Sequence, residues 1–204
     1  KAATNLALLG KTEGTNFTNS LLIGHATTGT LNDAKENTGV GIEALDALTS
    51  GDANTALGLR ALSTTNTGLQ NTAVGKEAMR ANSSGTKNTA VGSECLETNA
   101  DGNFNAALGR RALFANNTGD YNTGIGTEAL NSVTGHRNIG LGASAGQNIT
   151  TGSGNVIIGE VDAAAVDSTR TLKIAGYDGT TTTTWISGDA NGQVKLISGY
   201  VLEV

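Results

Sequence analysis

The chain has 204 residues, a formal net charge of −5, 29 Gly, no Pro, and only three Phe, three Tyr and one Trp. Its length suits one or two ordinary domains, but so few aromatic side chains argue against an ordinary globular core. The absence of Pro and the recurring Val, Leu and Ile argue against disorder. The scattered Lys and Arg form no basic stripe, which argues against a nucleic-acid partner, and the sequence has no apolar run of about 18 residues for membrane insertion.

Residues 1–19 form a lead-in segment, in which TNLALLG (4–10) resembles a degenerate copy of the repeat described next. The chain begins at Lys1, without Met or a signal peptide. We therefore expect a piece that was processed or cut from a longer protein, so targeting information is missing.

Residues 20–159 repeat with a period of 17 residues. NTAVGKEAM (71–79) returns as NTAVGSECL (88–96). The related units are SLLIG (20–24), NTGVGIEAL (37–45), NTALGLRAL (54–62), NAALGRRAL (105–113), NTGIGTEAL (122–130), NIGLGASAG (138–146, one residue early) and NVIIG (155–159). Within a unit, position one is Asn from residue 37 onward, position four is Val, Leu or Ile, and position five is Gly. Position eight is small and position nine is Leu or Met in the regular units, and a further Gly falls late in most units.

This pattern predicts an all-β fold, a β-solenoid or β-roll of about eight coils. A short alternating stretch suits a strand, the fixed Gly permits a bend or a positive φ, and the polar segment closes the coil. Coils about 4.8 Å apart would give a rod roughly 40 Å long. We expect the Asn column to form a ladder of side-chain amides and the Val column to enter the core. The Thr and Val positions share one strand face, and the Asn and Ala positions share the other, which is small and flat enough to pack against another chain.

Several residues invite a chemical interpretation, but the repeat favours structural roles. Cys95 occupies an Ala column, which predicts a buried small residue rather than a nucleophile. His25 and His136 lack the Cys/His spacing of a metal site. In register, the charges at position seven predict two Glu–Arg–Glu stripes along the rod rather than acid–base catalysis. These charges are Glu43, Arg60, Glu77, Glu94, Arg111 and Glu128. We therefore predict no catalytic, cofactor-binding or metal-binding residues, and no enzyme.

Residues 160–204 form a C-terminal β-rich region. TRTLKIAG (169–176) and TTTTWISG (181–188) alternate, and GQVKLISGYVLEV (192–204) is strand-like, so we expect that a further segment followed it. YDG (177–179) and DANG (189–192) are typical of hairpin turns. We expect Trp185 to anchor a small β core or a trimer contact rather than to stack on a sugar.

The repeats of the form NTAxGxxAL, closing with TGSGNVIIG (151–159) and STRTLKIAG (168–176), resemble those of bacteriophage tail fibre and spike proteins and of related bacterial surface proteins. In that family such repeats often precede a C-terminal intramolecular chaperone that cleaves itself off after trimer assembly. The coils are also similar to the left-handed β-roll heads of trimeric autotransporter adhesins, although the 17-residue period is longer than the typical adhesin coil. The resemblance implies a parallel homotrimer.

The expected function is therefore a structural and receptor-binding segment of a virion tail fibre that attaches to a host cell-surface glycan or protein. The variable loops are the expected contact surfaces. The alternatives are a bacterial trimeric adhesin head on the cell surface, a polysaccharide depolymerase, a spacer without a receptor site, and an ice-binding protein. Ice binding is disfavoured because the Thr column breaks at Ala106 and Ile139. The loop windows are 46–53, 63–70, 80–87, 97–104, 114–121 and 131–137.

Overall fold

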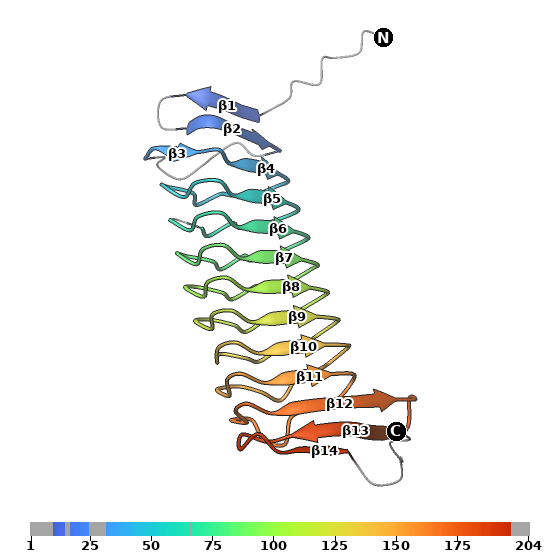
Figure 1. Cartoon of the computed structure of the whole chain (residues 1–204). Coiled ribbons are helices and arrows are strands. Elements are labelled where there is room, and N and C mark those ends of the chain that lie inside the picture. Colours follow the sequence, from blue (N-terminus) through green and yellow to red (C-terminus); the bar gives the residue numbers. More distant parts are fainter. Residues whose placement is uncertain (1–9, 15–16, 25–31, 66, 197–204) are drawn as a thin grey trace, which may run out of the picture.

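The structure, a computed structural model, describes residues 10–14, 17–24, 32–65 and 67–196. It confirms an all-β solenoid, with about nine turns and a spacing of 17 residues between equivalent positions. The described residues contain no helix. Their fourteen strands belong to one sheet, in which the coils stack into a rod (Figure 1). The sheet begins with β1 (Gly10–Gly14), β2 (Phe17–Ile23) and β3 (Ala34–Lys35).

Each regular coil contributes one three-residue strand to a parallel ladder. Equivalent residues pair directly, as Thr72, Ala73 and Val74 do with Thr89, Ala90 and Val91. These strands are β4 (Thr38–Val40), β5 (Thr55–Leu57), β6 (Thr72–Val74), β7 (Thr89–Val91), β8 (Ala106–Leu108), β9 (Thr123–Ile125), β10 (Ile139–Leu141) and β11 (Val156–Ile158).

The glycine at position five is required both by its backbone angle and by the distance to the next coil. Gly92 has φ of 141°, outside the usual range of residues with side chains. A Cβ atom on Gly92 would also lie 2.4 Å from the carbonyl oxygen of Gly109. The predicted bend is therefore confirmed, and close contact between coils is a second reason for the invariant glycine.

The core is a thin column of small side chains and one large side chain per coil. The large ones, at position nine, are fully buried: Leu45, Leu62, Met79, Leu96, Leu113 and Leu130. Position eight, which includes Ala78 and Cys95, is buried beside them. The middle residue of each strand, such as Ala73, also faces this column. One large and two small apolar residues per coil form this column, and each coil packs against the coils on both sides.

The structure reverses the expected roles of the two strand faces. Val74 and Val91 are only half-buried, and Leu108 is 50% exposed, so the Val column lies on the outside rather than in the core. The Asn and Ala columns point inward, so they do not form the flat face that was expected to pack against another chain. A valine is more apolar than an alanine, but only an Ala- or Gly-sized side chain fits opposite the leucine column. For example, a Cβ atom on Gly140 would lie 2.7 Å from Leu130 Cγ.

The predicted asparagine ladder is confirmed. The backbone N–H of Asn88 donates to Asn71 Oδ1 at 3.0 Å, and its side-chain Nδ2 donates to the carbonyl oxygen of Gly102 at 2.7 Å. The late glycine is needed because a Cβ atom on Gly102 would lie 2.5 Å from the carbonyl oxygen of Gly119. Every rung is buried: Asn37, Asn54, Asn71, Asn88, Asn105, Asn122, Asn138 and Asn155. The ladder satisfies buried backbone groups that the coil cannot pair by itself.

A second, shorter amide ladder was not predicted. Asn99 Nδ2 donates to Asn82 Oδ1, and Asn116 Nδ2 donates to Asn99 Oδ1, both at 2.8 Å. All three side chains are fully buried. The equivalent buried residues in flanking coils are Thr65 and Val133, so the column changes from polar to apolar toward the C-terminal end.

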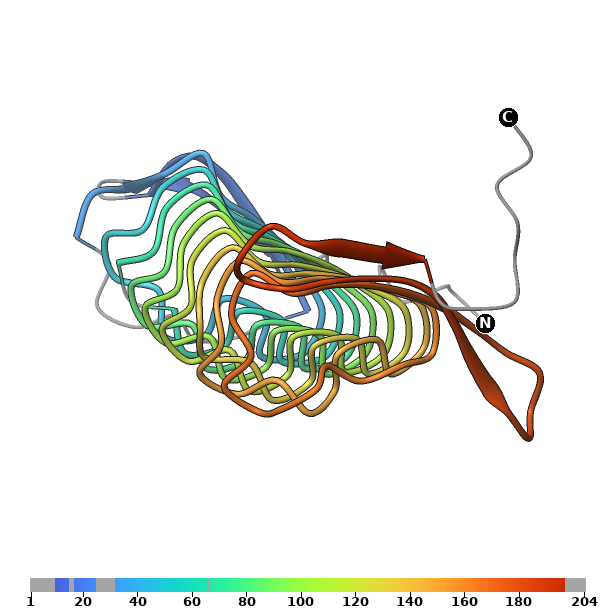
Figure 2. The same cartoon turned by 60° about the horizontal axis from the view of Figure 1, so that its bottom comes forward.

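Antiparallel strands close the sheet at both ends. β1 pairs with β2 at the N-terminal end. At the other end, β12 (Leu172–Tyr177) pairs in parallel with β11, and β13 (Thr182–Gly188) and β14 (Val194–Leu196) add antiparallel strands. The sheet therefore continues beyond residue 159, where the sequence predicted the end of the repeat region. The hairpin of β12 and β13 projects beyond the side of the rod (Figure 2).

The solenoid ends where the bend glycine is missing. Ile158 pairs with Ile174, so Ala175 stands at the position that follows Gly159 by one coil. In the regular coils the chain turns away from the sheet after this glycine. Here it runs straight on through Gly176 and Tyr177, which pair with Thr183 and Thr182 of β13. The extended β12 thus begins its departure from the coil where Ala replaces the bend glycine.

Candidate functional site

The outward face of the parallel sheet is a regular surface that runs along the rod. It carries two columns, one mainly Thr and one of Val, Leu or Ile. Leu57, Leu108 and Ile125 are 48%, 50% and 42% exposed. The remaining members of the apolar column are half-buried by their neighbours. A continuous apolar stripe of this kind is unusual on a monomer and is typical of an interaction surface.

The charged column at position seven forms the two predicted stripes. Arg60 Nε lies 2.5 Å from Glu43 Oε2, and Arg60 Nη1 lies 3.7 Å from Glu77 Oε1. Arg111 is placed in the same way between Glu94 and Glu128, at 3.7 and 3.4 Å. Charge compensation along the rod is thus confirmed as the local arrangement. These partly exposed pairs contribute little stability each.

A row of cations and aromatic rings runs along the loop edge of the rod. The rings of Phe104 and Tyr121 stack with centroids 4.9 Å apart and an interplanar angle of 2°. Lys87 Nζ lies 5.0 Å from the centroid of Phe104, and the guanidinium of Arg137 lies 5.4 Å from that of Tyr121. Each ring of the stacked pair therefore also has a cation over it. The spacings of 17, 17 and 16 residues between Lys87, Phe104, Tyr121 and Arg137 could have revealed the row, which falls within the predicted loop windows.

The side chains that invited a chemical interpretation are either buried or hydrogen-bonded to the scaffold. Cys95 is fully buried, and burial raises the pKa of its thiol to about 12. His136 Nδ1 accepts a hydrogen bond from the backbone N–H of Asp120 at 3.0 Å. His25 lies outside the described residues. Over the described part of the chain, no group of three or more His, Cys, Asp and Glu side chains could hold a metal ion.

Trp185 lies on the projecting hairpin and is 47% exposed. A Cβ atom on Gly176 would lie 2.6 Å from Trp185 Cζ2, so the indole lies directly over the backbone of β12. Within the chain it therefore covers a strand rather than anchoring a separate small core. Asp178 forms the adjacent turn, where hydrogen bonds from the backbone N–H groups of Thr181 and Thr180 lower the pKa of its carboxyl group.

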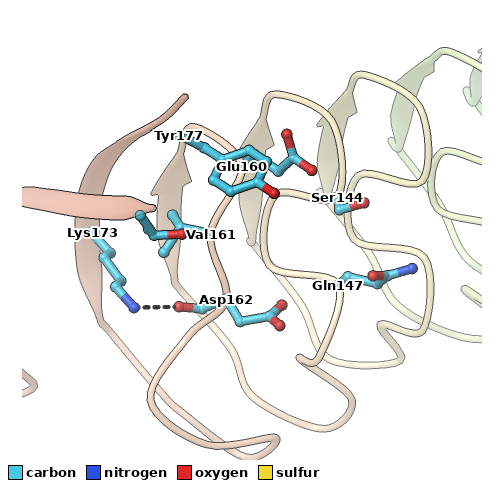
Figure 3. A pocket seen from close by; sticks show the side chains of 8 residues that line it. Ser144, Gln147, Glu160, Val161, Asp162, Lys173 and Tyr177 are labelled. Carbon is cyan, nitrogen blue, oxygen red and sulfur yellow. Dashed lines mark hydrogen bonds between the residues drawn. The ribbon is translucent and has the colours of Figure 1, made fainter. Parts of the chain in front are cut away.

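A pocket of about 440 Å³ lies between the last coils and the projecting hairpin (Figure 3). The coils contribute Ser144, Gln147 and residues 160–162, and the hairpin contributes Lys173, Tyr177 and Thr182. Lys173 Nζ donates to the backbone oxygen of Asp162 at 2.8 Å, which connects the two walls. No signal in the sequence indicated this pocket, because it forms where the last coil departs from the repeat and most of its residues follow the last repeat unit.

Comparison with protein-family models, with curated proteins and with solved structures finds no match to this chain. Its surfaces must therefore be interpreted from their own chemistry. No helix that could cross a bilayer occurs in the part of the chain that the structure describes.

Proposed function

We propose that this chain is a segment of a homotrimeric bacteriophage tail fibre that attaches the virion to a host cell surface. The observation that carries this proposal is the exposed apolar column on the outward sheet face. The strands that carry this column stack along the rod (Figure 1). Three parallel copies around one axis would cover these stripes and leave the loop edges facing outward. The family resemblance of the repeats supports the same arrangement.

The mechanism of this proposed function is multivalent attachment. Each chain of a trimer would present the same surfaces at the same height on the fibre, and weak sites held together raise the effective concentration for the second and third contacts. The loop edges are suited to this role, because they carry the side chains that vary between coils. The sheet face is suited to assembly, because its outer column is Val, Leu or Ile in every coil.

The assembly part of the proposal is tested by light scattering on the purified chain. We expect a mass of three chains, and a mass of one chain would overturn it. The attachment part is tested by incubating the fluorescently labelled chain with cells of candidate host strains. Retention on one strain and not on others supports attachment. Absence of retention on every strain, with the trimer intact, would leave a structural spacer as the better description.

One observation favours ice binding as a second candidate function. The Thr column lies outward on a flat parallel sheet, and Thr38, Thr55 and Thr89 are exposed. Against this, the column is interrupted by Ala106 and Ile139, and Leu57 and Leu108 stand exposed in the adjacent column. A measurement of thermal hysteresis decides the matter: a freezing point equal to the melting point rejects ice binding.

A further inference from the structure

The pocket at the C-terminal end of the rod exists because the last coil departs from the repeat in two ways. In the regular coils two residues separate the bend glycine from position eight, as Ala143 and Ser144 separate Gly142 from Ala145. The N–H of Leu130 donates to the Ala145 oxygen, and one coil later the N–H of Gly146 donates to the Val161 oxygen. Val161 therefore occupies position eight.

Only Glu160 lies between Gly159 and Val161, so the last coil is one residue shorter at this corner. The second departure is Ala175, after which the chain continues along β12 instead of forming another coil over the gap. The shortened corner and the straight strand together leave the hollow that Figure 3 shows.

Three polar side chains of the pocket, those of Lys173, Asp162 and Gln147, are held in place by bonds to the scaffold. Asp162 Oδ1 accepts from the backbone N–H of Asn148 at 2.9 Å. Gln147 Nε2 donates to Glu128 Oε2 at 3.1 Å. Within the described residues, Asp162 Oδ2, the amide oxygen of Gln147 and the Glu160 carboxylate have no partner. Groups that are positioned in advance lose less conformational entropy when a ligand binds.

The chemistry of the lining selects among ligand classes. The volume of the pocket is within the range of about 300–1,000 Å³ that small-molecule sites occupy. Carboxylates, hydroxyls, an amide and an ammonium outnumber the two apolar surfaces, Val161 and the Tyr177 ring, which disfavours an apolar ligand. Glu160 and Asp162 against the single Lys173 give the pocket a formal charge of −1, which disfavours an anion. A ligand with several neutral hydroxyl groups fits this lining, since each hydroxyl can both donate and accept.

We propose that this pocket binds a neutral saccharide, with Glu160 and Asp162 accepting hydrogen bonds from its hydroxyl groups. The ring of Tyr177, whose residue is 44% exposed, packs against the apolar C–H face of the sugar. Lys173 donates to a ring or hydroxyl oxygen while it keeps its bond to Asp162. This inference rests on the proposed attachment function, for which the saccharide is the surface component that the fibre recognises.

The test is saturation-transfer NMR and calorimetry on the full chain with defined disaccharides. The panel contains glucose, galactose and mannose disaccharides as neutral probes, and a glucuronic-acid disaccharide as the acidic probe. We expect one or more neutral probes to bind at about millimolar concentration, and the acidic probe to bind more weakly. Binding of no neutral probe, or tighter binding of the acidic probe, would overturn the proposal.

Substitutions in the pocket test whether the saccharide binds there. Glu160→Gln should weaken the binding of the neutral probe about tenfold, because it removes a charged acceptor without changing shape. Tyr177→Leu should weaken it about threefold to tenfold. Asp167→Asn is the control, since Asp167 is an exposed carboxylate of the same end of the rod outside the pocket. Circular dichroism shows whether each variant keeps its β structure. Unchanged affinity in both pocket variants would place the sugar elsewhere and overturn the proposal.

The same variants separate this inference from the attachment function. If labelled Glu160→Gln chain still binds host cells as the wild type does, the fibre attaches through another surface and the pocket proposal fails alone. If the wild-type chain binds neither cells nor saccharides, both proposals fail.

Discussion

Individual buried positions differ in whether their polar atoms find partners. Asn82, Asn99 and Asn116 form a connected ladder, while Thr65, the residue one coil before Asn82, has a fully buried hydroxyl without a partner among the described residues. A buried polar group without a hydrogen bond costs free energy, because it has lost its bonds to water. The polar ladder is thus incomplete at its N-terminal end.

We expect Thr65→Val to raise the free energy of unfolding by about 1 kcal/mol, because it replaces the unpaired hydroxyl by a methyl group of the same shape. The neighbouring Thr64 provides the matched control. Its hydroxyl donates to the backbone oxygen of Arg80 at 2.6 Å, so Thr64→Val should lower stability by about 0.5–1 kcal/mol. Urea denaturation of both variants checks this prediction. A lower midpoint for Thr65→Val would show that its hydroxyl is bonded in solution.

Cys95 gives the fold a dependence on alkaline pH. Burial, the larger cause, raises the pKa of its thiol from 9.0 to about 12, against a smaller lowering by its hydrogen bond to the backbone of Val91. The unfolded thiol therefore ionises first. Its contribution to stability is complete below pH 9 and is lost as the pH rises from about 9 to about 12.

In the variant Cys95→Ala, which restores the residue found in neighbouring coils, this loss should disappear. We expect the wild type to lose about 1 kcal/mol relative to Cys95→Ala between pH 8 and pH 10. Urea midpoints at the two pH values measure the difference. Parallel pH profiles for the two proteins would mean that the thiol is ionised as easily in the rod as in the unfolded chain.

At the scale of the coil, the spacing between turns is set by glycines rather than by the apolar residues. The bend glycines approach the carbonyl groups of the next coil so closely that a methyl group has no room. The asparagine ladder fixes the same spacing at the other end of the strand. Its hydrogen bonds are 2.7–3.2 Å long, as for Asn88. Each coil is therefore tied to its neighbours at both ends of its strand.

We predict that Gly92→Ala lowers the free energy of unfolding by about 3 kcal/mol or more, because the new Cβ atom meets the Gly109 carbonyl and the residue keeps a positive φ. Ser93→Ala, one residue later and half-buried, is the control and should change stability by less than about 0.5 kcal/mol. Thermal unfolding monitored by circular dichroism compares the melting temperatures of the two variants. Equal melting temperatures would contradict the argument from close contact.

The repeat made some features of the coil predictable and hid others. The ladder at Asn88 and the bend at Gly92 followed from the period alone, because a column that never varies must make the same contact in every coil. The inward direction of Ala73 did not follow, because alternation defines two faces without saying which of them meets Met79 and its equivalents. The pocket was beyond prediction for a related reason: it arises at the shortened corner beside Glu160 and at Ala175, where the pattern fails.

At the scale of the whole molecule, the described part of the rod has a well-paired interior and an outward sheet face with an exposed apolar column. Self-association is the proposed reason that Leu57 and Leu108 remain apolar although each is about half exposed. A charge at these positions would remain solvated in a single chain but would be desolvated in an interface between chains. The state of assembly is therefore the property that should respond to substitution on this face.

We predict that Leu57→Glu combined with Leu108→Glu reduces the mass measured by light scattering from three chains to one, while the β-sheet signal in circular dichroism persists. The control is Leu69→Glu. Leu69 is 39% exposed and apolar, but it lies in the loop before Asn71 rather than on the sheet face, so its variant should remain trimeric. Dissociation by both variants would mean that the loop edge also joins chains. If the wild type is a trimer and the doubly substituted protein also remains a trimer, the sheet face is not the interface.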